Sequence, residues 1–287
     1  MGHPQDSGHA LFHDQRHWRR CHHQLGGAGA APQTELTETG MIKAHFLALG
    51  AAALALAACD KAADNATAAA NASGAAAAVP PPAGKDWTQV VTITPEGGFL
   101  MGNPNAKVKL IEYLSLTCPH CKEFEEKGFP PLRDQYVKKG TVSLEVRNYV
   151  RDFVDMTATL VSRCGGADPY FPMTQQIMEQ QNEIFEKLQN VPPAEQQRLQ
   201  GLTPAEQFKA VASLIGIDQF AKQRGITQAK LDACLSDKAA VDKLVDMQQK
   251  ANTMQIPGTP AFFLNGTMLQ NVGTWEQLEP ELKAAGA

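Results

Sequence analysis

The chain has 287 residues, and its 26 lysines and arginines stand against 30 aspartates and glutamates, which gives a formal net charge of −4. This balance predicts no basic patch for nucleic acid. A hydrophobic content of 43% is ordinary for a globular protein, and the length allows one large domain or two small ones.

The pattern of residues 1–58 predicts a leader rather than part of a folded domain. Residues 41–58 begin with Met41 and Lys43 and continue with an apolar stretch, which is typical of a secretory signal peptide and too short to span a membrane comfortably. Residues 1–40 hold six of the eight histidines and show no hydrophobic periodicity. We expect them to be an upstream extension of a chain whose translation starts at Met41. A His-rich metal-binding tail is the alternative.

Cys59 follows Leu56-Ala57-Ala58, and this segment resembles the lipobox of bacterial lipoproteins, in which the cysteine becomes the lipidated first residue. Cleavage by the ordinary signal peptidase is the alternative. Asp60 resembles the signal that keeps lipoproteins at the inner membrane in enteric bacteria. We therefore expect a periplasmic protein held to the inner membrane by a lipid anchor. Residues 59–85 are rich in alanine and end in a proline run, which predicts a flexible tether.

From residue 86 onward the pattern is that of a folded domain. Val90 to Thr94 alternates weakly and predicts an edge strand, and Glu96-Gly97-Gly98 predicts a turn. An apolar run from Val108 to Leu116 predicts the main strand, and Thr141 to Tyr149 predicts the next one.

A helix is predicted between these two strands, beginning at Cys118. We expect it to be interrupted at Gly128-Phe129-Pro130-Pro131, because proline lacks an N–H donor and clashes with the preceding turn. It should resume from Leu132 to Lys139, with Gly140 as its C-terminal stop.

The next hundred or so residues predict helices, several of them with N-terminal caps such as Thr203-Pro204-Ala205-Glu206 and Thr227. The predicted helices run from 155 to 163, 172 to 188, 193 to 199, 203 to 215, 218 to 223, 227 to 236 and 238 to 253. Strand signals return at Ala261 to Leu264, followed by an Asn265-Gly266 hairpin turn, a short strand and a closing helix over 274–284. This order predicts an α/β thioredoxin fold, a mixed sheet flanked by helices, with an all-helical insertion at about 152–254.

Cys118-Pro119-His120-Cys121 carries the most specific chemistry in the chain. It lies between the predicted strand and helix, so its thiols are at a helix N-terminus, where unpaired N–H groups and the helix dipole favour negative charge. A thiolate at Cys118 is therefore stabilised, and the segment predicts a redox site. A metal-binding or interaction module is the alternative. A structural zinc site needs four ligands, and the other thiols after Cys59 are Cys164 and Cys234.

Those two cysteines remain once Cys21 is placed in the leader and Cys59 at the lipid site. In an oxidising, exported compartment they predict a structural disulfide that closes a loop of about 70 residues. Two buried free thiols are the alternative. His120 is the one histidine after residue 58, which excludes a His-cluster metal site or a Ser-His-Asp arrangement without it.

Residues from about 85 to the end resemble the DsbA family of exported thiol–disulfide oxidoreductases. The resemblance is carried by Gly102-Asn103-Pro104, Ile111 to Ser115, the Cys-Pro-His-Cys segment, the helical insertion and Gly258 to Phe262. It implies a donor of disulfides to reduced or unfolded exported proteins, with the Cys118–Cys121 disulfide as its redox group and no separate cofactor or metal. It also implies reoxidation by a DsbB-like, quinone-linked membrane protein.

The resemblance assigns roles to the active-site segment. Cys118 would be the exposed attacking sulfur and Cys121 the buried resolving one. Pro119 and His120 between them are the pair that this family uses. His120 would favour the Cys118 thiolate through charge or hydrogen bonding and so raise oxidising power.

Two further residues, Glu112 and Pro260, match the family pattern, and Thr259 departs from it. Glu112 matches a buried acid that would relay protons to Cys121, with an exposed edge-strand carboxylate as the alternative. Pro260 matches a cis-proline, with a trans loop proline as the alternative, and the Thr259 backbone would hold an extended substrate segment. Isomerase- and reductase-type relatives carry threonine at the position of Thr259, where the best-known DsbA proteins have valine, so the direction of electron flow stays open.

Overall fold

The computed structural model describes residues 80–287. The predicted extension at 1–40, the signal peptide at 41–58, the lipidation site Cys59 and most of the 59–85 tether lie outside the described residues.

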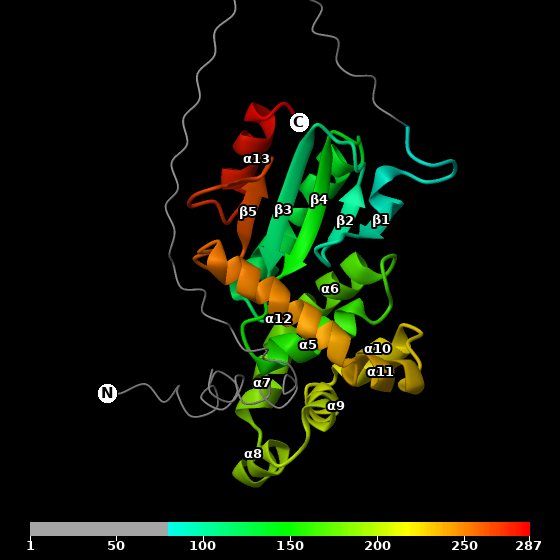
Figure 1. Ribbon diagram of the computed structural model, residues 1–287, viewed down its shortest axis with the longest axis vertical. Helices are drawn as coiled ribbons and strands as arrows, with labels where there is room; N and C mark the ends of the chain where they lie inside the picture. Colours follow the sequence, from blue (N-terminus) through cyan, green and yellow to red (C-terminus); the bar gives the residue numbers. More distant parts are fainter. Residues whose placement is uncertain (1–79) are drawn as a thin grey trace, which may run out of the picture. The chain divides into compact units, whose positions relative to one another are not determined.

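Six strands form one mixed sheet in the order β1-β2-β4-β3-β5-β6 (Figure 1). β3 and β4 pair in parallel, and every other neighbouring pair is antiparallel. Parallel neighbours need a crossover connection, which the helices after Cys118 supply. The strands are β1 (Val91–Ile93), β2 (Phe99–Gly102), β3 (Val108–Leu114), β4 (Val142–Asn148), β5 (Ala261–Leu264) and β6 (Thr267–Met268).

Strand β2 is an element that the sequence pattern did not predict. Its four residues stand between Gly97-Gly98 and Asn103-Pro104, so turn-forming residues surround a very short apolar run. Phe99 lies opposite Val146 of β4, and its side chain is 1% exposed. Pairing and burial, rather than local propensity, therefore create this strand.

The helix after Cys118 continues through the point where we expected a break. α3 (Pro119–Lys127), α4 (Phe129–Pro131) and the π-helical η2 (Leu132–Val137) follow one another, and Gly128 between the first two has helical dihedral angles. Pro130 and Pro131 lie in the first turn of α4, where a missing N–H costs little. The prolines change the type of helix and introduce no loop. Gly140 follows with φ +76°, a conformation that favours glycine.

Eight helices lie between β4 and β5. The stretch predicted as one helix from 172 to 188 is two, divided at Gln180. The expected caps are present: Thr203 forms a capping box with Glu206, and the Thr227 side chain accepts a hydrogen bond from the Lys230 N–H. The helices are α5 (Phe153–Arg163), α6 (Tyr170–Glu179), α7 (Gln181–Gln189), α8 (Pro193–Gln200), α9 (Pro204–Leu214), α10 (Ile217–Gln223), α11 (Gln228–Leu235) and α12 (Lys238–Thr253).

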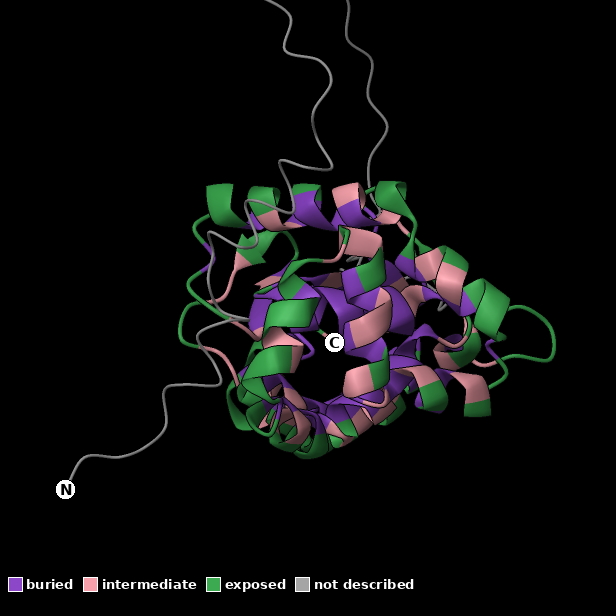
Figure 2. Ribbon diagram, turned by 90° about the horizontal axis from the view of Figure 1, so that it is seen from below, coloured by how far each residue is buried: buried purple, intermediate pink, exposed green. Residues whose placement is uncertain are grey.

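The two faces of the sheet are covered by different helices. On one face Phe262 of β5 contacts Phe124 of α3, with ring centroids 4.8 Å apart, and the closing helix α13 (Trp275–Ala284) adds Leu278 to the same core. On the other face Tyr113 packs with Ala251 of α12. α12 thus covers the sheet although it falls within the expected insertion, which leaves α5 to α11 as the helical subdomain. In Figure 2 the buried parts of the ribbon lie mainly toward the inside of the described residues, and the exposed parts lie mainly toward the outside.

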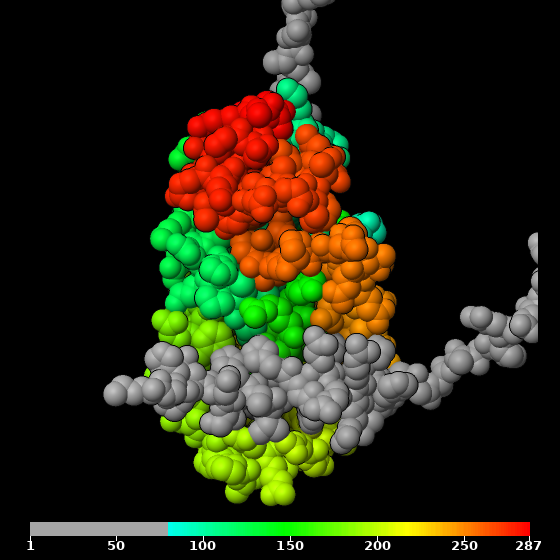
Figure 3. All heavy atoms as spheres, turned by 90° about the vertical axis from the view of Figure 1, so that its left-hand side faces the viewer, coloured from blue at the N-terminus to red at the C-terminus, as the bar shows by residue number. Residues whose placement is uncertain are grey.

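The helical subdomain lies at the end of the sheet that is opposite α13. Figure 3 shows α13 in red at one end of the described part and the yellow-green helices of the subdomain at the other. Phe129 of α4 stacks on Phe171 of α6 with ring centroids 6.0 Å apart, which joins the two parts. No helix within residues 80–287 is both long enough and apolar enough to cross a membrane.

Candidate active site

Cys118 is the N-cap residue of α3, with an extended backbone (φ −91°, ψ 120°) and Pro119 at the first helical position. Its Sγ donates a hydrogen bond to the carbonyl oxygen of Thr259 at 3.1 Å. Cys121 lies one turn further along the helix and is 0% exposed, against 4% for Cys118. Both thiols are free, so the structure represents the reduced site.

The two thiols differ in acidity. The pKa of Cys118 is lowered from 9.0 to about 5, chiefly by a hydrogen bond from the Cys121 side chain, with further bonds from the Thr259 side chain and from the backbone N–H groups of Cys121 and His120, although burial opposes them. The pKa of Cys121 is raised well above 9.0 by burial, then by its bond to Cys118 and by nearby negative charge on Cys118 and Glu112. At neutral pH the site therefore holds a thiolate at Cys118 and a thiol at Cys121.

His120 acts on Cys118 through its backbone. The side chains of Pro119 and His120 are exposed, and the His120 N–H is one of the groups that lower the pKa of Cys118. The N-terminal amides of α3 therefore add to the hydrogen bond from the Cys121 side chain in stabilising the thiolate, as expected for an anion at a helix N-terminus.

Glu112 lies fully buried in the middle of β3, beneath α3. Neither carboxylate oxygen has a hydrogen-bond partner among the described residues. Burial raises the pKa of Glu112 well above 4.5, and negative charge on Glu125 and Cys118 raises it further. The exposed edge-strand alternative is therefore excluded. A protonated carboxyl beside Cys121 can give and take a proton.

Glu125 is a second buried acid at this site, and our reading of the sequence missed it. It is 4% exposed, and burial raises its pKa from 4.5 to about 8. It lies four residues after Cys121 in α3, and residues at this spacing share one face of a helix. That spacing was the available signal. Two buried carboxyl groups, those of Glu112 and Glu125, therefore lie beneath the redox pair.

The loop that precedes β5 forms the other side of the site. The Thr259–Pro260 peptide bond is cis, and the Thr259 carbonyl is the one that contacts Cys118. A pocket of about 450 Å³ opens beside it, lined by residues 257–261 and 268–273. An exposed backbone segment and a pocket therefore lie next to the reactive sulfur.

Two side chains from the helical subdomain hold the loop between β3 and Cys118. Asp155 of α5 accepts hydrogen bonds from the Leu116 N–H at 2.9 Å and from the Ser115 hydroxyl at 2.7 Å. Gln181 of α7 donates to the carbonyl oxygens of Leu116 at 2.8 Å and Cys118 at 3.1 Å. No motif marks either residue, because each acts on backbone groups tens of residues away in the chain.

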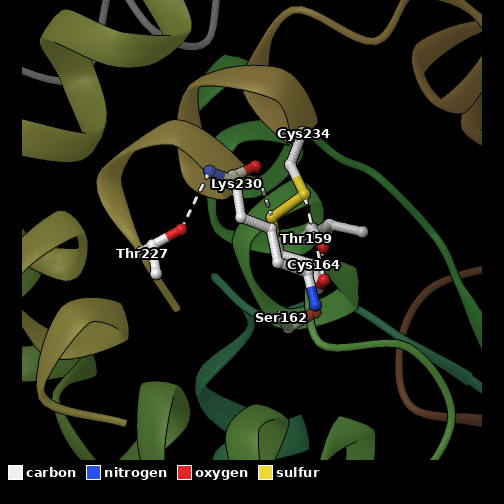
Figure 4. Close-up of a disulfide and its surroundings, with 6 residues drawn as sticks. All are labelled: Thr159, Ser162, Cys164, Thr227, Lys230 and Cys234. Carbon is white, nitrogen blue, oxygen red and sulfur yellow. Dashed lines mark hydrogen bonds between the residues drawn. A yellow bond between two sulfur atoms is a disulfide. The ribbon is translucent and has the colours of Figure 1, made fainter. Parts of the chain in front are cut away.

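Cys164 and Cys234 are joined by a disulfide, with a Cα–Cα distance of 5.8 Å (Figure 4). The bridge ties the C-terminal end of α5 to α11 and closes a loop with a sequence separation of 70 residues. This is the expected pairing, and it excludes two free thiols. Within residues 80–287 no group of three or more His, Cys, Asp or Glu side chains is placed to hold a metal ion.

Comparison with known proteins places this site in a family. A family model described as thioredoxin matches residues 94–284. The crystal structure of a protein-disulfide isomerase from Novosphingobium aromaticivorans is 35% identical, with a TM-score of 0.61, over 66% of this chain and 97% of that chain. Wolbachia pipientis alpha-DsbA1 shares the fold, with a TM-score of 0.54 and 21% identity, over 67% of this chain and 92% of that one.

The curated relatives are more distant. A Rickettsia bellii protein named for protein-disulfide oxidoreductase activity is 25% identical over 182 residues, which are 61% of this chain and 60% of that protein. The chain thus spans less than two thirds of that relative's length. The family model covers most of the chain. The chain therefore belongs to the thioredoxin family and has the fold of its DsbA-like members.

Proposed function

We propose that this chain is a thiol–disulfide oxidoreductase that introduces disulfides into exported proteins through Cys118 and Cys121. The observation that carries the proposal is the contrast between the two thiols: the pKa of Cys118 is lowered to about 5 and that of Cys121 is raised. A thiolate that persists at neutral pH stabilises the reduced form. A site whose reduced form is stabilised is an oxidant.

The exchange proceeds in two displacements. A substrate thiolate attacks Sγ of Cys118 in the oxidised site, the bond to Cys121 breaks, and Cys121 leaves with the electron pair and takes up a proton, which Glu112 can supply. A second substrate thiolate then attacks the substrate sulfur of the mixed disulfide, and Cys118 leaves as its thiolate. The substrate dithiol loses two electrons and both protons. The site gains the two electrons and one proton, which ends on Cys121 once Glu112 is reprotonated, and the second proton passes to solvent.

The pocket beside Thr259 suits an extended substrate segment. Its lining includes residues 257–261. We propose that the backbone of this segment pairs with a peptide main chain, which would not require a particular substrate sequence. Such pairing fits an enzyme that acts on many unfolded chains.

Turnover requires a two-electron oxidant, for which we propose a DsbB-like, quinone-linked membrane protein. A lipid anchor at Cys59 would hold the enzyme in the periplasm beside that partner at the inner membrane. Cell fractionation tests the anchor: we expect the protein in the inner-membrane fraction and the Cys59→Ala variant outside it. Recovery of the wild-type protein in the outer membrane would contradict this placement.

A reductase or isomerase is the second candidate, and two observations favour it. Thr259 is the residue that isomerase- and reductase-type relatives carry before the proline, and the Novosphingobium structure is named a protein-disulfide isomerase. A non-catalytic metal-binding module is a weaker candidate, and zinc retained on purification with unreactive cysteines would support it.

Equilibration in glutathione redox buffers separates these functions. Alkylation of Cys118 is followed by peptide mass spectrometry, which distinguishes it from Cys164 and Cys234. A midpoint potential of about −120 mV, as in DsbA, marks a disulfide donor. A midpoint potential of about −270 mV, as in thioredoxin, marks a reductase. Repair of scrambled disulfides marks an isomerase. The Cys118→Ser variant should abolish disulfide transfer in each of these cases.

A further inference from the structure

Leu116 lies in the loop that leads into Cys118. Side chains of the helical subdomain form hydrogen bonds with both its backbone N–H and its carbonyl oxygen. Its N–H donates to Asp155, and its carbonyl accepts from Gln181. The same Gln181 carboxamide also donates to the carbonyl of Cys118. One side chain therefore links α7 to the residue that carries the reactive sulfur.

The orientation of this carboxamide follows from its partners. Both are carbonyl oxygens, which can only accept hydrogen bonds, so the NH₂ end must face them. Gln181 is 1% exposed and is the first residue of α7, at the division from α6. Because the group is buried, water cannot readily replace its two hydrogen bonds.

We propose that Gln181 is a positioning residue for thiol exchange at Cys118, an inference that rests on the proposed function. By holding the N-cap carbonyl of α3, it keeps Sγ of Cys118 directed at the N–H groups of His120 and Cys121. The helical subdomain thereby takes part in the chemistry of the redox pair.

Two physical effects act in the same direction. The Cys118 carbonyl also accepts the first hydrogen bond of α3, from the Lys122 N–H at 3.1 Å. The amide hydrogens of Gln181 offset the negative end of this carbonyl dipole, which lies close to the thiolate. Without them the dipole is less compensated and the loop is freer to move away from the helix N-terminus. Both changes disfavour the thiolate and raise the pKa of Cys118.

The test uses Gln181→Met, which keeps the length of the side chain and removes both donors. The matched control is Gln207→Met, because Gln207 is also buried in the helical subdomain and donates to the Leu199 carbonyl at 2.8 Å. A second control is Gln180→Met, because Gln180 is the C-cap residue of α6 and its side chain donates to the Gln176 carbonyl of that helix. The rate at which iodoacetamide alkylates Cys118 in the reduced protein is measured against pH by peptide mass spectrometry.

We expect the alkylation midpoint of Gln181→Met to rise by about one pH unit, which lowers the thiolate fraction about tenfold below the midpoint. Gln207→Met should have a lower Tm than the wild type and an unchanged alkylation midpoint. Gln180→Met should change neither quantity. If Gln181→Met and Gln207→Met lower the Tm by similar amounts and both keep the wild-type alkylation midpoint, Gln181 has only a structural role and the proposal is overturned. The midpoint does not depend on the direction of electron flow. A low redox potential would therefore overturn the proposed function and leave this result standing.

The wild-type protein gives a test that does not depend on how a variant folds. The side-chain amide signals of Gln181 are followed by ¹⁵N NMR while the reduced protein is titrated. We expect an inflection in these signals at the alkylation midpoint of Cys118, because the Gln181 amide is hydrogen-bonded to the carbonyl of Cys118. The inflection should be absent in Cys118→Ser. Signals that stay flat through this range would overturn the proposal.

Discussion

The thiolate at Cys118 should stabilise the reduced protein at neutral pH, and this contribution should disappear on acidification. The perturbation is Cys118→Ser, which replaces the thiol by a smaller hydroxyl that does not ionise in this range. Carboxyl groups elsewhere in the protein also titrate between neutral and acidic pH. Their effects largely cancel when the variant is compared with the wild type at each pH.

The magnitude follows from linkage between ionisation and folding. A group whose folded pKa is depressed contributes stability that is complete above its unfolded pKa and is lost as the pH falls through its folded pKa. For Cys118 these values are 9.0 and about 5. pH 7 lies about two units above the folded pKa of Cys118. Each unit contributes about 1.36 kcal/mol to the free energy of unfolding, which gives about 2.7 kcal/mol. Solvent screening at the open side of the site reduces this figure, so we expect about 2 kcal/mol.

The assay is urea unfolding at pH 7 and pH 5 in the presence of a thiol reductant. The difference in free energy of unfolding between the wild type and Cys118→Ser should shrink by about 2 kcal/mol between pH 7 and pH 5. A difference that stays constant over this range would mean that Cys118 is not held as a thiolate. The hydrogen bonds from the Cys121 side chain and from the N-terminal amides of α3 would then not be sufficient to stabilise a thiolate.

Three further changes test the surroundings of the redox pair. Glu112→Gln removes the proton donor and acceptor beside Cys121, so the attack of Cys121 on a mixed disulfide should slow about 10- to 100-fold in quenched-flow experiments, and an unchanged rate would contradict the relay. Glu125→Gln removes a carboxyl whose folded pKa of about 8 exceeds 4.5, so the wild type loses stability as the pH rises between these values. The variant should gain about 3 kcal/mol on the wild type between pH 5 and pH 8 in urea unfolding, and parallel curves would refute this. The double variant Cys164→Ala/Cys234→Ala should lose about 4 kcal/mol, the loop-entropy value for the bridged loop, and a loss below about 1 kcal/mol would contradict a structural role for the bridge.

Local sequence was sufficient for the features that depend on neighbours along the chain. The strand–turn–helix order around Cys118 followed from hydrophobic patterning, and the capping box at Thr203 followed from residue types at fixed spacing. The pairing of Cys164 with Cys234 followed from counting cysteines. In each case the information lies within a few residues or in the composition of the chain.

The tertiary structure decided the features that depend on contacts between distant segments. β2 exists because β4 pairs with it, and α12 covers the sheet because Ala251 meets Tyr113. Glu125 becomes a buried acid with a raised pKa only when its face of α3 is covered, and Gln181 reaches the carbonyl of Cys118 only when α7 packs beside the active-site loop. Propensity and periodicity are local properties of a sequence. Burial and hydrogen-bond partners are set by packing between residues far apart in the chain, and the acidity of the redox pair depends on both.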